Sequence, residues 1–411
     1  MNVALTHIKE WCKYKISELS YGEKPAVKAG PFGSTIKKED YVPFGYKVYG
    51  QEQVIKNDPF YGDYYISEEK YTQLSSCAVA SGDILVSLVG TVGKVLIVPD
   101  NFELGVINPR LIRISLDKTI TFPPFIKLIL EAKKTNRLLN RWAQGGTMGV
   151  LNAGMFQNLP VLLPPLPEQK AIADVMTTWD EAIEKTKGMI QAKERLKHCE
   201  FRSLISSQKV NSTIGKFVKL VVRKIDKPDQ SYTALGIRSH FKGTFQRVVE
   251  DPKTVNMDTL YRVKENDLIL NITFAWEGAI ALVKKDDENC YVSHRFPTYE
   301  IQRKKAEPIF IRQLIMSSRM KYDLANISPG GAGRNRVLNK KDFLKMPVWL
   351  PDLEKQKSIG EYLEALDREI DLLKQLREKY ILQKCGLMQK LLTGEWRIKH
   401  EIVNKYKEGN V

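Results

Sequence analysis

The sequence predicts an α+β fold in which two tandem mixed α/β domains are each followed by a long helix. The main observation is a repeat: residues 163–205 begin LPPLPEQKAIADVM, and residues 350–392 begin LPDLEKQKSIGEYL. Matched residues such as Pro164 and Pro351 lie 187 positions apart, and the repeat contains no gap. Short apolar runs between glycine-rich turns precede each copy, which is typical of a mostly β domain. A repeat of this length indicates duplication of a module of about 190 residues rather than a solenoid.

Each copy predicts a long helix, because prolines suit the first turn of a helix and the polar run that follows has periodic apolar residues. These residues alternate at spacings of three and four, which is the a/d pattern of a coiled coil. A lone amphipathic helix would more often lie on its own domain. Two helices of matched length favour packing on each other, and a helix of residues 168–205 would be roughly 57 Å long, which suits a spacer. The residues assigned to helix–helix packing or to the docking of a partner subunit are Ile172, Val175, Trp179, Ile183, Met189 and Leu196 in the first helix, and Ile359, Tyr362, Leu366, Ile370, Leu373 and Leu376 in the second.

The repeat divides the chain into a first mixed domain (1–165), a first helix (166–208), a second mixed domain (209–351), a second helix (352–393) and a tail (394–411). Both domains have the same expected order of elements. We expect strands at 83–89, 94–98 and 105–114 and a helix at 123–142 in the first domain, and strands at 267–273, 279–283 and 291–301 and a helix at 308–325 in the second. The long helices match closely and the β parts do not, which indicates one scaffold with two different binding surfaces.

The composition indicates a polyanionic partner. The chain has 64 Lys and Arg against 48 Asp and Glu, a net charge of +16 and a pI near 9.4. A basic balance of this size is typical of nucleic-acid binding. No apolar run is long enough to span a membrane and the N-terminus lacks the layout of a signal peptide, so we expect a cytoplasmic protein. The five cysteines are scattered without a CxxC pair, which predicts reduced thiols and no metal site.

The sequence contains no motif that predicts catalysis. Phosphate loops of the GxxxxGK[ST] type, GxGxxG, HExxH and GxSxG are all missing. Asp58-Pro59-Phe60 is a poor match to the Asn/Asp-Pro-Pro-aromatic segment of a DNA methyltransferase and is better interpreted as a turn. Asp83 and Asp267 are expected to close the turns before their strands. We therefore predict no catalytic residue, and two alternatives stay open: a methyltransferase or endonuclease in its own right, and a coiled-coil or RNA-binding scaffold.

Candidate DNA contacts follow from side-chain chemistry. Arginine and asparagine make bidentate contacts to guanine and adenine edges, whereas lysine mainly neutralises phosphate. The glycine loops at 145–149 and 329–336 fit either close contact with a phosphate backbone or simple turns. Trp276 and Glu277 fit either core and turn positions or a ligand-facing loop. The candidate DNA-binding residues are Lys37, Lys38, Arg110 and Thr147 in the first domain, and Arg238, Ser239, His240, Lys242, Arg334, Asn335 and Arg336 in the second.

These motifs together resemble the specificity subunit of type I restriction-modification systems. The resemblance rests on the repeated LPPLPEQKAIA helix, DILVSLVGTVGKV, NDLILNITFAWEGA, VSHRFPTYEI and GGAGRNRVLNKKDF, and it covers almost the whole chain. It implies two target recognition domains that each bind one half of a bipartite, asymmetric DNA site. It also implies that the two long helices pack as an antiparallel coiled coil and dock the methyltransferase subunits.

The resemblance further implies partners and cofactors. The expected partners are double-stranded DNA, two DNA methyltransferase (modification) subunits and restriction/translocase subunits, without membrane contact. The chain itself is expected to hold no cofactor, because S-adenosylmethionine, ATP and Mg would bind to the partner subunits. A helical spacer predicts half-sites of a few base pairs, separated by an unread gap of roughly half a turn of DNA or more.

Overall fold

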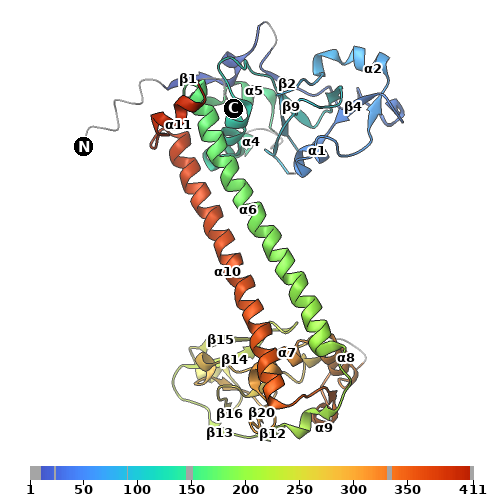
Figure 1. The fold of residues 1–411 in the computed structure, drawn as a ribbon, viewed down its shortest axis with the longest axis vertical. Coiled ribbons are helices and arrows are strands. Elements are labelled where there is room, and N and C mark those ends of the chain that lie inside the picture. Colours follow the sequence, from blue (N-terminus) through green and yellow to red (C-terminus); the bar gives the residue numbers. More distant parts are fainter. Residues whose placement is uncertain (1–10, 23–24, 90, 145–150, 331–335, 408–411) are drawn as a thin grey trace, which may run out of the picture. The chain divides into compact units, whose positions relative to one another are not determined.

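The structure, a computed structural model, describes residues 11–22, 25–89, 91–144, 151–330 and 336–407. The chain forms two compact units: unit 1 contains residues 1–185 and 377–411, and unit 2 contains residues 186–376. Two long helices, α6 (Leu166–Phe201) and α10 (Leu353–Leu392), contribute residues to both units. Unit 1 therefore combines the beginning and the end of the chain, which are blue and red in Figure 1.

The described residues of unit 1 form two four-stranded sheets and a two-stranded ladder. The main sheet is antiparallel throughout. The second sheet includes one parallel pair, β4 (Tyr46–Tyr49) with β8 (Gly105–Ile107). The main sheet has the order β2 (Val27–Ala29), β9 (Leu111–Ile114), β6 (Ile84–Ser87), β7 (Val95–Ile97); the second has the order β3 (Tyr41–Val42), β5 (Tyr65–Ile66), β4, β8; and the ladder joins β1 (Cys12–Lys15) to β10 (Pro160–Leu163).

The described residues of unit 2 repeat this plan. The parallel pair of its second sheet, β14 (Tyr232–Ile237) with β19 (Tyr291–Val292), corresponds to β4 with β8. Because the main sheets have the same strand order, the prediction of two tandem mixed α/β domains is confirmed. The main sheet has the order β12 (Val218–Val221), β20 (Thr298–Ile301), β17 (Leu268–Leu270), β18 (Ile280–Leu282); the second has the order β13 (Lys224–Asp226), β16 (Thr259–Arg262), β19, β14, β15 (Thr244–Val249); and the ladder joins β11 (Ser212–Thr213) to β21 (Pro347–Val348).

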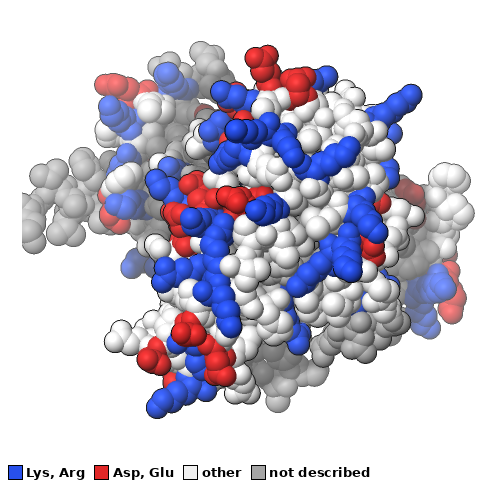
Figure 2. Space-filling view, turned by 90° about the horizontal axis from the view of Figure 1, so that it is seen from below, with Lys and Arg blue, Asp and Glu red and all other residues white. Residues whose placement is uncertain are grey.

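Basic side chains are spread over one face of unit 2. Figure 2 shows that lysine and arginine are spread over this face, whereas aspartate and glutamate gather in a few groups. A surface of this kind attracts a polyanion through long-range electrostatics, and the attraction weakens as salt screens it. This face of unit 2 therefore suits a polyanionic partner.

The helices expected at 123–142 and 308–325 are each interrupted, so the prediction of one helix in each place is wrong. The shorter helices are α1 (Gln51–Lys56), α2 (Glu68–Gln73), α3 (Pro123–Glu131), α4 (Lys133–Gln144), α5 (Ala153–Gln157), α7 (Pro308–Ile315), α8 (Ser318–Asn326), α9 (Lys340–Lys345) and α11 (His400–Lys405). The extended backbone of Ala132 ends α3. The Ser317 side chain accepts a hydrogen bond from Met320 N at 3.1 Å, which caps α8 as a new helix. None of the helices in the described part of the chain is both long and apolar enough to cross a membrane.

The strands expected at 105–114 and 291–301 are also each divided in two. Pro109 has no N–H to donate to a ladder, and it lies in the turn that joins β8 to β9. A turn at 293–297 joins β19 to β20 in the same way. Each turn carries the chain from the second sheet of its unit to the main sheet. The other predicted strands are present with shorter bounds.

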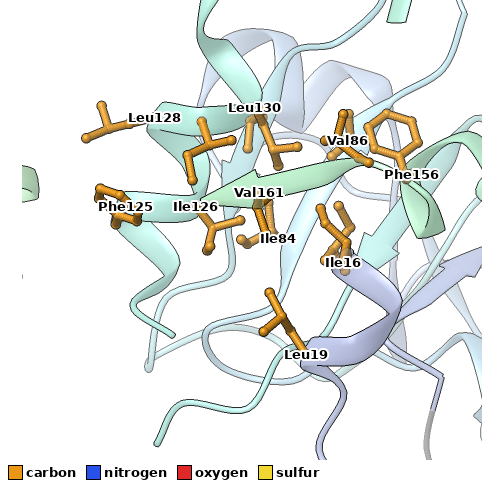
Figure 3. Packing of buried hydrophobic residues seen from close by; sticks show 14 of the residues in the cluster. Ile16, Leu19, Ile84, Val86, Phe125, Ile126, Leu128, Leu130, Phe156 and Val161 are labelled. Carbon is orange, nitrogen blue, oxygen red and sulfur yellow. The ribbon is translucent and has the colours of Figure 1, made fainter. Parts of the chain in front are cut away.

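The main core of unit 1 lies between its main sheet and the helices that cover the sheet. Figure 3 shows Ile84 and Val86 of β6 among side chains from α3, α5 and β10. Phe125 of α3 and Phe156 of α5 are fully buried there. Phe310 of α7 is likewise fully buried in the core of unit 2. Burial of each of these rings stabilises its unit by about 1.5–3 kcal/mol.

A buried glutamine holds the first turn of each long helix to its unit. Gln169 Oε1 accepts a hydrogen bond from Phe122 N at 2.9 Å, and its Nε2 donates to Ile120 O and Pro164 O, both at 2.9 Å. Both glutamine side chains are fully buried. The duplication therefore includes a hydrogen-bonding hub as well as a sequence pattern. Gln356 makes the three equivalent bonds, with Glu307 N (2.9 Å), Lys305 O (3.1 Å) and Pro351 O (2.7 Å).

Within each unit the two long helices run antiparallel and are joined by equivalent ion pairs. In unit 1, Lys384 of α10 pairs with Asp180 of α6. In unit 2, Lys197 of α6 pairs with Asp367 of α10. Asp367 lies 187 positions after Asp180, and Lys384 lies 187 positions after Lys197, so the duplication relates the two pairs. The antiparallel packing implied by the resemblance is confirmed within each unit.

Burial along the two long helices follows the predicted seam only in part. Ile172, Ile183, Ile359, Leu366 and Ile370 are buried as expected, and Val175, Trp179 and Leu373 are half-buried. Met189, however, is 52% exposed, whereas its neighbour Ile190 is 8% exposed. Leu196, Tyr362 and Leu376 are also exposed. Helix–helix packing or partner docking of these four residues stays a prediction. Ile190 is buried as well, and Met176 and Leu363 lie in the cores of unit 1 and unit 2.

Candidate nucleic-acid interface

Four loop segments of unit 2 meet at one edge of its sheets. Backbone hydrogen bonds connect them: His240 N donates to Glu277 O at 2.8 Å, Ile272 N to Arg295 O at 3.0 Å, and Leu338 N to Ile272 O at 2.8 Å. These bonds fix the loops relative to one another, so their side chains form one surface. We call this surface the unit 2 edge, and it consists of residues 238–243, 271–278, 293–297 and 336–338.

The turn at 238–243 holds an unusual backbone conformation. His240 and Phe241 have φ values of +60° and +57°, a region that residues other than glycine rarely adopt. Phe241 N donates to Gly278 O at 3.0 Å, which holds the turn in place. Gly278 itself has φ +81°, and a Cβ there would lie 2.9 Å from the Phe241 ring. Strain of this kind gathers at functional sites, which supports a binding role for the unit 2 edge.

Polar and aromatic side chains are paired across the unit 2 edge. Ser239 Oγ donates to Glu277 Oε2 at 2.8 Å. The Arg336 guanidinium lies 5.0 Å from the centroid of the Trp276 ring, which is within cation–π range. Trp276 and Glu277 are half-buried. They lie at the edge rather than inside the core, and this position supports their interpretation as a ligand-facing loop.

Unit 1 has a corresponding edge, which consists of residues 88–89, 91–93 and 108–110. Leu88 N donates to Arg110 O at 3.0 Å, which joins the two loops. The backbone of Gly30 passes so close to this turn that a Cβ on Gly30 would lie 1.9 Å from Asn108 O. Val89 and Val92 are exposed on the first loop. Exposed apolar side chains are present at both edges, because Phe274 and Val337 are exposed at the unit 2 edge.

Arg110 and Arg295 occupy equivalent positions at the two edges. Arg110 N donates to Asn108 Oδ1 at 2.9 Å, and Arg295 N donates to Ser293 Oγ at 3.4 Å, so a side chain closes each turn. The carbonyl of each arginine accepts a hydrogen bond from the loop beside it, at 3.0 Å in both units. Both arginines are exposed. Sequence reasoning selected Arg110 and missed Arg295, although Arg295 lies 185 positions after Arg110, close to the offset of the repeat.

The other predicted DNA-binding residues are placed as follows. Arg238 and Lys242 are exposed on the same turn as His240. Lys37 and Lys38 are exposed before β3, where Lys37 N donates to Asp40 Oδ2 at 2.6 Å. No contact among the described residues joins these two lysines to the unit 1 edge. Thr147, Arg334 and Asn335, with most of the two glycine loops, lie outside the described residues.

The buried carboxylates of the two main sheets have structural roles. Asp83 Oδ2 accepts a hydrogen bond from Ala80 N at 2.8 Å, and Asp267 Oδ2 accepts one from Lys264 N at 2.8 Å, so both residues close turns before their strands as predicted. Burial raises the pKa of Asp83 above its usual range. Arg223 forms a bidentate pair with Asp267. Within the described part of the chain, no group of three or more His, Cys, Asp and Glu is arranged to hold a metal ion.

The two-unit plan has counterparts of known structure. The HsdS subunit from Thermoanaerobacter tengcongensis aligns with 94% of this chain and 97% of its own, with a TM-score of 0.52 and 14% identity. The S subunit of the type I restriction-modification system from M. genitalium aligns with 93% of this chain and 96% of its own, with a TM-score of 0.51 and 15% identity. At these identities the likeness concerns the fold.

Sequence comparison supplies the family. The type I restriction enzyme MjaVIII specificity subunit of Methanocaldococcus jannaschii is 22% identical over 333 residues, which cover 72% of this chain and 75% of that protein. A family model described as the type I restriction modification DNA specificity domain matches residues 9–193 and 232–379. The match takes in both units and most of the chain. With two copies of this domain in tandem, the chain belongs to the family of type I restriction-modification specificity subunits.

Proposed function

We propose that this protein is the specificity subunit of a type I restriction-modification complex and binds duplex DNA through the edges of its two units. The observation that carries the proposal is the equivalence of the two edges, where the same closed turn presents an exposed arginine in each unit. A single chain with two equivalent but chemically different binding surfaces suits a DNA site made of two different halves. The site is therefore bipartite and asymmetric.

The neighbours of the two arginines explain why the half-sites differ. Beside Arg110 are the exposed valines 89 and 92, which suit apolar contact with a thymine methyl group. Beside Arg295 is the segment with Trp276 and Glu277, whose carboxylate accepts hydrogen bonds. The two units share one backbone plan, but the side chains beside the two arginines differ. Each unit then recognises its own short sequence.

The long helices are the proposed docking surface for two modification subunits, and restriction subunits join the resulting complex. Met189 and Leu196 lie seven residues apart, and both are exposed on α6, so they share one face of the helix. Tyr362 and Leu376 are exposed on α10. Exposed apolar residues on one helix face are typical of a protein contact. S-adenosylmethionine, ATP and Mg are then needed only on the partner subunits, and the cytoplasmic location stays a prediction.

The proposal is tested by mapping modified bases across the host genome with the gene intact and deleted. We expect one split, asymmetric motif to lose its methylation on deletion. Complementation with the intact gene should restore that motif alone. If no motif changes, binding of the purified chain to duplex DNA and RNA at fixed salt decides between a DNA-reading subunit and a scaffold for another polymer.

The alternative function, a methyltransferase in its own right, is separable by one measurement. The unit 2 edge carries an arginine stacked on an aromatic ring, Arg336 on Trp276, and such groups suit recognition. Calorimetric titration of the purified chain with S-adenosylmethionine is expected to give no binding. Saturable binding by the chain alone would favour the enzyme.

We also predict that the lengths of α6 and α10 set the unread gap of the motif. One heptad inserted after residue 185 in α6 and one after residue 376 in α10 preserve the seven-residue repeat and add about 10 Å, or about three base pairs. The methylated motif should keep both half-sites and lengthen its gap. The same seven residues added to the C-terminal tail form the control. An unchanged gap in the heptad variant would exclude the spacer role.

A further inference from the structure

We infer that Arg110 and Arg295 each read a guanine, one in each half of the DNA site. The inference rests on the proposed function and deepens it by naming a specificity-determining residue in each unit. Arg295 has no counterpart among the residues that sequence patterns selected in unit 2. Only the matching of the two folded units identifies the pair, through equivalent turns and equivalent backbone bonds.

The first step is the contrast between these arginines and the structural arginines beside them. Arg113 lies on β9 with its side chain 10% exposed, 3.8 Å from Asp83. Arg223 is held by both oxygens of Asp267. The guanidinium groups of Arg110 and Arg295 form no hydrogen bond or ion pair with any residue in the described ranges, and both are exposed. Their side chains therefore have no role in holding the fold and are available to a ligand.

The second step is the rigidity of the turns that present them. In each turn the arginine N–H is bonded to a side chain two residues earlier, and the arginine C=O is bonded to the neighbouring loop. The turn joins the second sheet to the main sheet, so it is anchored at both ends. In unit 1 the close approach of Gly30 to Asn108 removes any remaining space beneath it. A fixed backbone of this kind suits a geometrically demanding contact.

The third step is the choice between a base and a phosphate. A phosphate needs only a positive charge, which an exposed lysine such as Lys37 or Lys38 supplies. The planar guanidinium on a fixed turn matches the O6 and N7 acceptors of guanine in a bidentate contact. The segments beside each arginine, 88–89 with 91–93 in unit 1 and 272–278 in unit 2, differ in sequence between the units. Each arginine then specifies a guanine within a different sequence.

The test uses the full chain in complex with its modification subunits and duplexes that carry the mapped motif. Each guanine of the motif is replaced in turn by 7-deazaguanine, which removes the N7 acceptor without altering base pairing. For Arg295→Ala we expect an affinity for the parent duplex that is about 5- to 150-fold lower. We further expect that 7-deazaguanine at one position of one half-site lowers the affinity of the intact complex. The same replacement should not lower the affinity of the Arg295→Ala complex any further. Arg110→Ala should behave in the same way for the other half-site.

The conservative variants separate a base contact from a phosphate contact. Arg110→Lys and Arg295→Lys retain the charge and lose the bidentate fork, so neither should restore affinity for the parent duplex. The controls are Lys118→Ala and Arg303→Ala, which change basic residues at the opposite ends of β9 and β20. They should leave the base preference unchanged, and circular dichroism should show every variant folded.

Several outcomes overturn the inference while leaving the proposed function intact. The inference fails if a lysine variant restores binding, or if an alanine variant weakens binding to all duplexes equally. It also fails if both arginines act on the same half-site, or if one half-site contains no guanine. Failure of the proposed function is a different result. In that case the complex with the unaltered chain would show no preference for any duplex and no methylated motif would depend on the gene.

Discussion

Replacing Gln169 with leucine is expected to destabilise unit 1 by about 2–4 kcal/mol. The substitution keeps a side chain of similar size but leaves the Phe122 N–H and the carbonyls of Ile120 and Pro164 without their partner. Each unsatisfied buried polar group costs about 1–3 kcal/mol, and Phe122 N and Ile120 O cost less than Pro164 O because they are only partly buried. Urea denaturation should show the loss. Hydrogen exchange should accelerate at residues 120–130, where α3 begins.

Unit 2 contains the equivalent glutamine, so the prediction can be tested twice, and an exposed glutamine of α6 serves as the control. Gln356→Leu removes the equivalent bonds in unit 2, so the loss there should be of similar size. Gln191 is exposed on α6, and Gln191→Leu should change stability by less than about 0.5 kcal/mol. A Gln169 variant as stable as the Gln191 variant would mean that the buried hub contributes nothing.

Replacing Gly30 with alanine is expected to displace the turn that presents Arg110. The added Cβ would lie 1.9 Å from Asn108 O and 2.6 Å from Asn108 C. Both are backbone atoms, so relief requires movement of the turn rather than of a flexible side chain. Overpacking of this kind costs about 1–3 kcal/mol. Methylation of the split motif should fall sharply, and DNA affinity should fall through the half-site read by unit 1.

Gly33→Ala is the matched control, because it makes the same change three residues later in the same segment. No atom lies within 4 Å of a Cβ built on Gly33. The control should therefore retain its thermal midpoint and its methylation. If the two variants methylate the motif equally, the position of the Asn108–Arg110 turn does not matter for recognition.

Much of the scaffold could be predicted because the chain contains it twice. The offset of 187 positions predicted both long helices. Residues related by this offset, Gln169 with Gln356 and Asp180 with Asp367, form equivalent hydrogen bonds and ion pairs in the structure. When a buried contact is duplicated, the residues that form it recur in both copies, because the same buried groups need hydrogen-bond partners in each. The candidate DNA contacts were predicted less completely, because exposed side chains carry no such constraint.

Hydrophobic periodicity alone did not identify which residues of the long helices are buried. Val175 and Met176 are adjacent apolar residues, and so are Met189 and Ile190, so two registers one residue apart fit the sequence equally well. In the folded protein Met176 lies in the main core of unit 1, Ile190 is buried and Met189 is exposed. Hydrophobic periodicity defines a helix face only to within about one residue, and the facing helix determines the rest.

The two-module plan, the paired helices and the basic character could be predicted from the amino-acid sequence, because repetition, periodicity and total charge are local or summed over the chain. The family was indicated by the resemblance of motifs such as DILVSLVGTVGKV. Which loops share an edge, and that Arg295 is the counterpart of Arg110, became evident in the folded protein. The reason is that this equivalence depends on backbone hydrogen bonds between segments far apart in the chain, Leu88 with Arg110 and Ile272 with Arg295. The sequence contains both residues of such a hydrogen bond, but it does not show that they lie close together in the folded chain.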